Sequence, residues 1–187
     1  NLLPIGIILT HCHFDHITGT KILKEHFPNC KIAIHDLDKD AASQNAKQMQ
    51  ENILNGMGFD FFISALENLP NIDITFLGNE TLNAFTSPEL SSQAIEQLNN
   101  WKIIHTPGHT PGGICLFNKN EKQLISGDTL FRGTWGRTDL PTSSFENIIN
   151  SITEKLMNLP EDTIIYPGHG KSTIIRDIRD LNAQGIM

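Results

Sequence analysis

Short runs of β-branched and apolar residues alternate along the chain with longer segments in which apolar residues recur every three or four positions. The run 5–9 predicts a buried strand, residues 17–27 predict a helix with one apolar stripe, and the alternation in 31–35 predicts a second strand. Strand, loop, helix and strand in this order are typical of a βαβ unit. We therefore expect an α/β layered domain.

The pattern is weaker in the middle of the chain. An aromatic group there, Phe59, Phe61 and Phe62, is interpreted as part of a small satellite core, with a lid over a site as the less favoured alternative. The other elements expected in this region are a helix over 37–54, strands over 72–77 and 80–85 joined by a hairpin turn at 78–79, and a helix over 88–100.

The pattern sharpens again from Trp101 onward. Most of the strands predicted here lead into loops that contain glycine or proline. Because there is no internal repeat and no long linker, we expect one domain over residues 1–187. The expected elements are strands over 101–105, 114–117, 123–125 and 163–166, a helix over 143–157, and a final helix capped by Ser172 and running to 180.

Composition narrows the possible functions. The 187 residues suffice for one domain with a proper core, and 39% of them are hydrophobic. The formal net charge of −7 argues against a nucleic-acid partner, and no apolar run is long enough for a membrane span or a signal peptide. The three cysteines, Cys12, Cys30 and Cys115, form no C-x-x-C pair, which favours reduced thiols and a cytoplasmic location.

The most informative stretch is Thr-His-Cys-His-Phe-Asp-His at 10–16, directly after the first predicted strand. It contains four groups that can bind a metal: His11, His13, Asp15 and His16. Alternate side chains of an extended segment share a face, so His11 and His13 can reach one point while Cys12 points away. Packing in the hydrophobic core does not explain so many adjacent polar groups. We therefore interpret the stretch as a metal site.

Three further residues follow predicted strands in the same way: His109, Asp128 and His169. With the first cluster they supply five imidazoles and two carboxylates, whereas one tetrahedral zinc needs four ligands at most. Seven donors fit two adjacent metals that share a carboxylate. A donor set without thiolate favours catalytic Zn(II), Fe or Mn over a structural zinc cage.

Four motifs in this order, T-H-C-H-F-D-H, T-P-G-H-T-P-G-G, G-D-T-L-F and Y-P-G-H-G, resemble the metallo-β-lactamase superfamily. Within it, they resemble the glyoxalase II-like (hydroxyacylglutathione hydrolase-like) branch, and the match runs from Ile5 to His169. The resemblance implies a four-layer αβ/βα sandwich. Because the chain opens at Asn1 within the first predicted strand, we expect the usual N-terminal strands of this fold to be lacking.

The resemblance also implies roles for the seven donors. A metal-bound hydroxide would attack a thioester or another acyl carbonyl, with Asp15 helping to orient the nucleophile. The implied ligands are His11, His13 and His109 for the first metal, Asp15, His16 and His169 for the second, and Asp128 as a bridge between them.

The segment Gly136-Arg137-Thr138-Asp139 resembles both small bacterial glyoxalase II-like hydrolases and persulfide dioxygenases of the same fold. Arg137 is the candidate to bind a substrate carboxylate, such as that of a glutathione conjugate, because guanidinium binds carboxylate bidentately. A salt bridge from Arg137 to Asp139 is an equally weighted alternative.

The leading hypothesis is a dinuclear metal-dependent hydrolase of small thioesters or esters, with two divalent metals, Zn(II) first and Fe or Mn next. The alternative is a mononuclear iron persulfide dioxygenase in which His11, His109 and Asp128 bind iron. A non-catalytic protein ranks low because all seven donors are present. The expected partner is a small-molecule substrate, and the oligomeric state is not indicated by the sequence.

Overall fold

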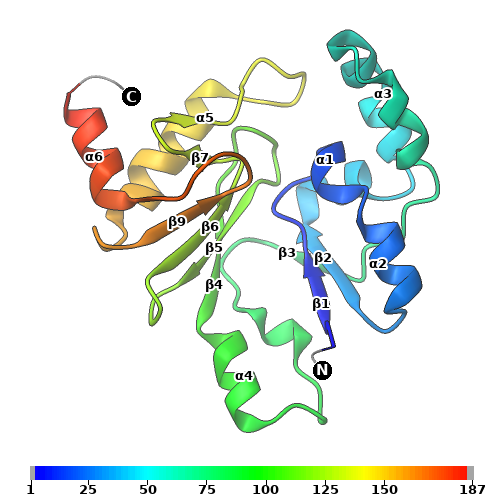
Figure 1. The fold of residues 1–187 in the computed structure, drawn as a ribbon, viewed down its shortest axis with the longest axis horizontal. Helices are drawn as coiled ribbons and strands as arrows, with labels where there is room; N and C mark the ends of the chain where they lie inside the picture. The colour runs from blue at the N-terminus through cyan, green and yellow to red at the C-terminus, as the bar shows by residue number, and fades with distance from the viewer. Residues whose placement is uncertain (1–2, 185–187) are drawn as a thin grey trace.

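Two β-sheets face each other across the centre of the molecule, and helices lie on their outer sides (Figure 1). The computed structural model describes residues 3–184. The smaller sheet has the order β1-β2-β3 and is entirely parallel: β1 (Gly6–Ile8), β2 (Lys31–His35) and β3 (Ile74–Phe76). The helix between its first two strands completes the βαβ unit that the sequence predicts.

The larger sheet is mixed and has the order β10-β9-β6-β5-β4. Strands β6 and β9 are parallel, so the residues that follow them lie at the same edge of the sheet. A separate two-stranded ribbon is formed by β7 (Leu130–Phe131) and β8 (Thr134–Trp135). The strands of the larger sheet are β4 (Trp101–His105), β5 (Ile114–Asn118), β6 (Gln123–Gly127), β9 (Ile164–Pro167) and β10 (Thr173–Ile174).

The helices fall into two groups on either side of the paired sheets (Figure 1). Helices α1 (Phe14–Ile17), α2 (Thr20–His26) and α3 (Ala46–Met57) accompany the smaller sheet, and α5 (Phe145–Asn150) and α6 (Ile175–Ala183) accompany the larger one. Helix α4 (Ser92–Asn99) packs at the end of β4. No described helix has the length and hydrophobicity needed to cross a membrane.

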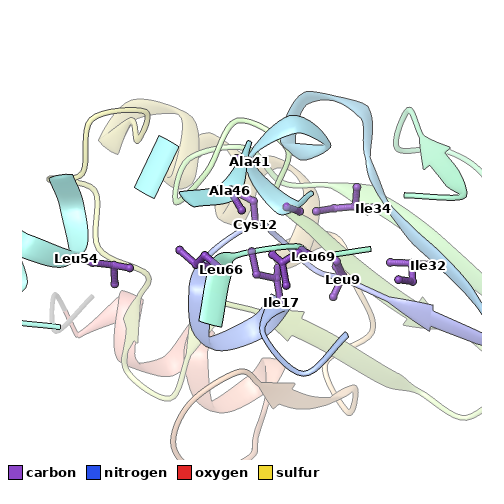
Figure 2. Packing of buried hydrophobic residues seen from close by; sticks show 11 residues of the cluster. Leu9, Cys12, Ile17, Ile32, Ile34, Ala41, Ala46, Leu54, Leu66 and Leu69 are labelled. Carbon is purple, nitrogen blue, oxygen red and sulfur yellow. The ribbon is translucent and has the colours of Figure 1, made fainter. Parts of the chain in front are cut away.

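Three buried apolar clusters fill the three spaces between the four layers. The first, shown in Figure 2, joins the outer face of the smaller sheet to α1, α3 and the 3-10 helix η3 (Asp60–Leu66), and includes Ile17 and Leu54. The second lies between the two sheets and includes Phe76 and Ile103. The third joins the larger sheet to α5 and α6. The α/β four-layer sandwich implied by the sequence is confirmed.

The predicted hairpin at 78–79 is wrong. Strand β3 pairs only with β2, and the chain then crosses to the other sheet, where the amides of Ile103 and His105 donate to the carbonyls of Glu80 and Gly78. The Glu80 carboxylate builds the turn, because it accepts hydrogen bonds from the amides of residues 77, 78 and 79 at 2.7–2.8 Å. The segment after it forms a 3-10 helix, η4 (Leu82–Phe85), in place of a strand.

Two predicted helix boundaries are also wrong. The helix expected from residue 37 begins only at Ala46, after two short 3-10 turns over 36–38 and 40–42. The final helix begins at Ile175, and its first residue is preceded by Ile174 without a side-chain cap, so Ser172 does not cap it. Boundaries depend on tertiary contacts more than on the local pattern.

Candidate metal centre

All seven predicted donors lie together where the strands of both sheets end. His11 and His13 follow β1, Asp15 and His16 lie in the short helix α1, and the other three come from the larger sheet. A register shift between Ile125 and Gly127 of β6 and a positive φ of 50° at Gly127 mark a bulge directly before Asp128. Bulges of this kind change the direction of the following side chain, here toward the donors from β1.

The donor atoms form three overlapping groups, in each of which the atoms lie within 4.8 Å of one another. In the three-histidine group, His13 Nδ1 and His109 Nε2 are 2.8 Å apart. The groups are His11, His13 and His109; His11, His16 and Asp128; and Asp15, His16 and His169. The structure therefore brings together the two implied ligand sets and connects them.

Asp128 lies between the two sets. Its Oδ2 is 3.6 Å from Nε2 of His109 and 3.4 Å from Nε2 of His169, and its Oδ1 is 3.5 Å from Nε2 of His16. On the exposed side, Asp15 Oδ2 is 3.1 Å from Nε2 of His169. One carboxylate thus faces histidines from both sets, which is the arrangement that a bridging ligand requires.

Burial shifts the pKa of three members of this cluster. Burial, reinforced by the neighbouring histidines, holds the pKa of His11 well below its ordinary value and lowers that of His13 to about 3. Burial also raises the pKa of Asp128, against the opposing effect of His16, His109 and His169. Neutral imidazoles keep the lone pair that a metal needs.

The donor set fits divalent metal ions. His11 Nε2, His16 Nε2 and Asp128 Oδ1 are buried and have no hydrogen-bond partner, which is costly unless a cation satisfies them. His109 keeps the correct nitrogen free, because its Nδ1 is 2.9 Å from the carbonyl of Arg137 and donates to it, leaving Nε2 as the lone-pair atom. Imidazole and carboxylate donors without thiolate suit Zn, Fe or Mn.

Two glycines allow the close packing around Asp128. A Cβ at Gly168 would lie 2.2 Å from Oδ1 of Asp128 and 2.9 Å from Cε1 of His16. A Cβ at Gly136 would lie 1.9 Å from the carbonyl oxygen of Asp128. Neither position tolerates a side chain without displacement of the donors.

Asp38 was missed by the sequence analysis. It is fully buried and accepts hydrogen bonds from the amide of Cys12 at 3.2 Å, the hydroxyl of Thr110 at 2.6 Å and the amide of Gly112 at 2.7 Å. Cys12 lies between two donors, and Thr110 follows His109, so one carboxylate ties together the two loops of the three-histidine group. Its only sequence signal is an acid shortly after the strand 31–35.

The sequence also drew attention to Cys12, His35, His105 and Arg137, which are not among the seven donors. Cys12 packs in the core, as expected, and belongs to none of the three donor groups. His35 and His105 stack on each other with ring centroids 4.0 Å apart, away from the donors. Arg137 reaches the site and forms the alternative contact weighed above, a bidentate ion pair with Asp139 in which both N–O distances are 2.7 Å.

A cavity of about 460 Å³ opens beside the donors. Five of the seven donors line this cavity: His13, Asp15, His109, Asp128 and His169. Phe59 lines it, and the rings of Phe59, Phe61 and Phe62 pack together as a small aromatic cluster that is partly exposed, with Phe61 66% exposed. A substrate of moderate size can reach the donors from this cavity.

Comparison with known proteins agrees with this architecture. Residues 4–169 match the model of the family described as the metallo-beta-lactamase superfamily. The chain is 35% identical over 171 residues to the hydroxyacylglutathione hydrolase GloC of Haemophilus influenzae, covering 90% of this chain and 70% of that protein.

Two solved structures share the fold. The BLEG-1 B3 metallo-beta-lactamase has a TM-score of 0.76 and 28% identity, covering 96% of this chain and 76% of that one. TTHA1623 in a di-iron-bound form has a TM-score of 0.67 and 26% identity, covering 95% and 76%. The chain therefore belongs to the metallo-beta-lactamase superfamily and is a metal-dependent hydrolase of the glyoxalase II-like kind.

Proposed function

We propose that the protein is a dinuclear hydrolase of small thioesters or related esters. The observation that supports this best is the position of Asp128, whose carboxylate faces His109 of the first ligand set and His16 and His169 of the second. A single-metal site would leave one of these sets without a cation. The first metal would be held by His11, His13 and His109, and the second by Asp15, His16 and His169.

The overall reaction adds water to the thioester carbonyl and breaks the C–S bond. The products are a carboxylic acid and a thiol, and the thiol takes up one proton of the water. Two divalent metals, when bound, lower the pKa of water and stabilise the negative charge that develops on the carbonyl oxygen. We infer Zn(II) as the first candidate, with Fe or Mn as the others.

The chain itself contributes positioning and charge. Asp15 is about one-third exposed on its side chain, lines the cavity and lies 3.1 Å from His169, where its carboxylate can orient the attacking water. Asp128 lies between the two histidine sets and would serve as the ligand that both metals share. Arg137 lines the cavity and is the one cationic residue in its lining, so it is our candidate for contact with an anionic part of a substrate.

Relatives support the substrate class. GloC is a hydroxyacylglutathione hydrolase, and TTHA1623 holds two irons, so a thioester substrate and a two-metal centre are both consistent with the family. We infer a small-molecule thioester substrate, with glutathione-linked thioesters as candidates. We also propose a cytoplasmic location and no nucleic-acid or membrane partner, in keeping with the acidic composition.

Metal content of the freshly purified protein, measured by elemental mass spectrometry per folded chain, tests this proposal first. Close to two metal ions per chain, together with thioester turnover that is lost on chelation, is the expected result. About one iron per chain, with oxygen consumption on a persulfide and no thioester turnover, would replace the hydrolase by a dioxygenase of the same fold.

A further inference from the structure

Apart from the metal donors, most of the cavity lining is apolar, and we call this part of the lining the apolar wall. Several of its residues come from α3, which lies at the side of the smaller sheet (Figure 1). The apolar lining residues are Phe14, Ile53, Leu54, Met57, Phe59, Phe131 and Leu140.

Helix α3 presents one regular stripe to the cavity. Gln50, Ile53, Leu54 and Met57 are spaced i, i+3, i+4 and i+7, so they share a face of the helix. The NH2 group of Gln50 is already used, because it donates to the carbonyls of Cys12 and Ala41, each at 2.8 Å. Apart from the side-chain oxygen of Gln50, the stripe therefore offers the cavity apolar contact.

Most of these apolar side chains are incompletely covered by the protein, although Leu54 is fully buried. Ile53 and Met57 are half-buried, and Phe59 is 37% exposed although its ring lies close to that of Phe14, with centroids 5.9 Å apart. When a ligand removes apolar surface inside a cavity from water, the change in free energy is favourable and strengthens binding. The occupant of this wall should be apolar.

The charged residues that line the cavity also favour an apolar occupant. Apart from Asp15 and Asp128 at the metal centre, the one charged residue of the lining is Arg137, and Asp139 already neutralises its guanidinium with two hydrogen bonds. A substrate part with several charges would find one cation there, and that cation is already paired. The cavity thus separates a polar reaction centre from an apolar wall.

We propose that the apolar wall binds the acyl group of the thioester, and that the enzyme acts on thioesters with an unbranched hydrocarbon acyl chain in preference to short or hydroxylated ones. This inference rests on the proposed hydrolase function and specifies its substrate class. The carbonyl lies at the metal donors, the acyl chain runs along α3, and the thiol points toward the open side of the cavity.

The first test uses the metal-loaded wild-type enzyme with acetyl, butanoyl and hexanoyl thioesters of one small thiol, and with the lactoyl thioester of the same thiol. Each methylene buried from water contributes about 0.8 kcal/mol, so kcat/KM should rise about fourfold per methylene along the series. The lactoyl thioester should be a poorer substrate than butanoyl. A parallel series that lengthens the thiol at constant acyl group should be nearly flat.

A second test uses matched substitutions in one helix. Met57→Asn and Ile53→Asn place an amide on the wall, and each should lower the ratio of hexanoyl to acetyl kcat/KM by about tenfold, roughly two methylene contacts. Met49→Asn makes the same change at a residue of α3 that is 49% exposed and outside the cavity, and should keep the wild-type ratio. Circular dichroism of each variant verifies folding.

A binding measurement separates this inference from the hydrolase proposal. Calorimetry should show that hexanoate binds the metal-loaded protein more tightly than acetate, and that Met57→Asn reduces this difference by about tenfold. If this holds but no thioester is hydrolysed, the wall is confirmed and the hydrolase proposal fails. If thioesters are hydrolysed but kcat/KM is flat with acyl length, rises with thiol length, or is highest for lactoyl, the acyl assignment is overturned and the hydrolase remains.

Discussion

The hydroxyl of Thr110 donates a hydrogen bond of 2.6 Å to the carboxylate of Asp38, 72 residues earlier in the chain. The same carboxylate accepts the amides of Cys12 and Gly112, so it joins the loop of His11 and His13 to the loop of His109. Asp38 is therefore a positioning residue for the three-histidine group.

Replacement of Asp38 should affect both metal binding and folding. Asp38→Ala leaves three buried donors unpaired and should lower the free energy of unfolding by about 3–5 kcal/mol. Asp38→Asn keeps the shape, but its NH2 group must face a backbone amide in either orientation, so a loss of about 1.5–3 kcal/mol is expected. Urea denaturation of the metal-free protein measures both changes.

The metal affinity of the folded Asp38→Asn variant separates positioning from simple stability. We expect an affinity about 10–100-fold weaker in competition with a chelator, and an altered visible spectrum with Co(II). Asp36→Asn, at an exposed position two residues earlier, is the control and should change neither. A wild-type Co(II) spectrum and affinity in Asp38→Asn would show that the residue stabilises the fold without positioning the ligands.

Replacement of a single ligand should lower the occupancy of one metal site or of both, depending on which ligand is replaced. His169→Asn removes a donor of the second group only, so the purified protein should retain about one metal per chain. Asp128→Asn weakens the one carboxylate that faces both groups and should lower occupancy of both. Elemental mass spectrometry gives the count, with His26→Asn, at an exposed helix end, as the control that keeps the wild-type value. Equal loss of metal in His169→Asn and Asp128→Asn would contradict two separable sites.

The seven candidate donors could be predicted from the sequence because each follows a regular strand, either in the loop after it or, for Asp15 and His16, in the short helix α1. His11 and His13 alternate on an extended segment, and His109 and His169 follow strands and are flanked by glycine. These are local patterns, and parallel strand ends meet at one edge of a sheet. The local pattern was therefore sufficient to predict that residues more than 150 positions apart in the chain lie close together.

Features that depend on the other sheet could not be predicted in this way. The turn at Gly78 looks like a hairpin, but the Glu80 carboxylate redirects the chain to β4, a strand that lies later in the sequence. Asp38 resembles any surface acid until the loops of His11 and His109 close around it. Likewise, Phe59 could be assigned to the cavity only once α3 and the metal centre were placed in three dimensions.

Gly168→Ala should damage the metal centre without touching a donor. The added methyl group would lie 2.2 Å from Oδ1 of Asp128, so the carboxylate must move away from its position between the two histidine sets. We expect loss of bound metal together with a fall in stability of about 1–3 kcal/mol from overpacking. Metal titration and thermal unfolding measure the two effects.

Gly56→Ala is the matched control for this substitution. Nothing lies within 4 Å of a Cβ at Gly56, which is in α3, so alanine should stabilise the helix by about 0.5–1 kcal/mol and leave metal binding unchanged. Full metal occupancy in Gly168→Ala would show that Asp128 can shift without loss of its bridging position.

His35, which stacks on His105, should make the free energy of unfolding depend on pH. This effect is separate from that of the metal donors. Burial, with the adjacent His105, lowers the pKa of His35, while Asp38 and Glu80 act in the opposite direction. The ring is held neutral in the fold, since its Nδ1 accepts the amide hydrogen of Leu37.

The sign of the effect follows from the lowered pKa. Below the ordinary pKa of 6.5 the unfolded chain takes up a proton at His35 that the folded protein does not, so stability falls as the pH falls toward the folded-state value. The slope from this group cannot exceed about 1.4 kcal/mol per pH unit. His35→Gln should be less stable than wild type at pH 8 but lose less stability between pH 6.5 and 5.

Urea denaturation of both metal-free proteins across this range provides the measurement. The donor histidines titrate in both proteins, so their contribution cancels in the difference between wild type and His35→Gln. Parallel stability profiles for the two proteins would mean that His35 binds its proton equally in the folded and unfolded states, which would contradict the lowered pKa of His35.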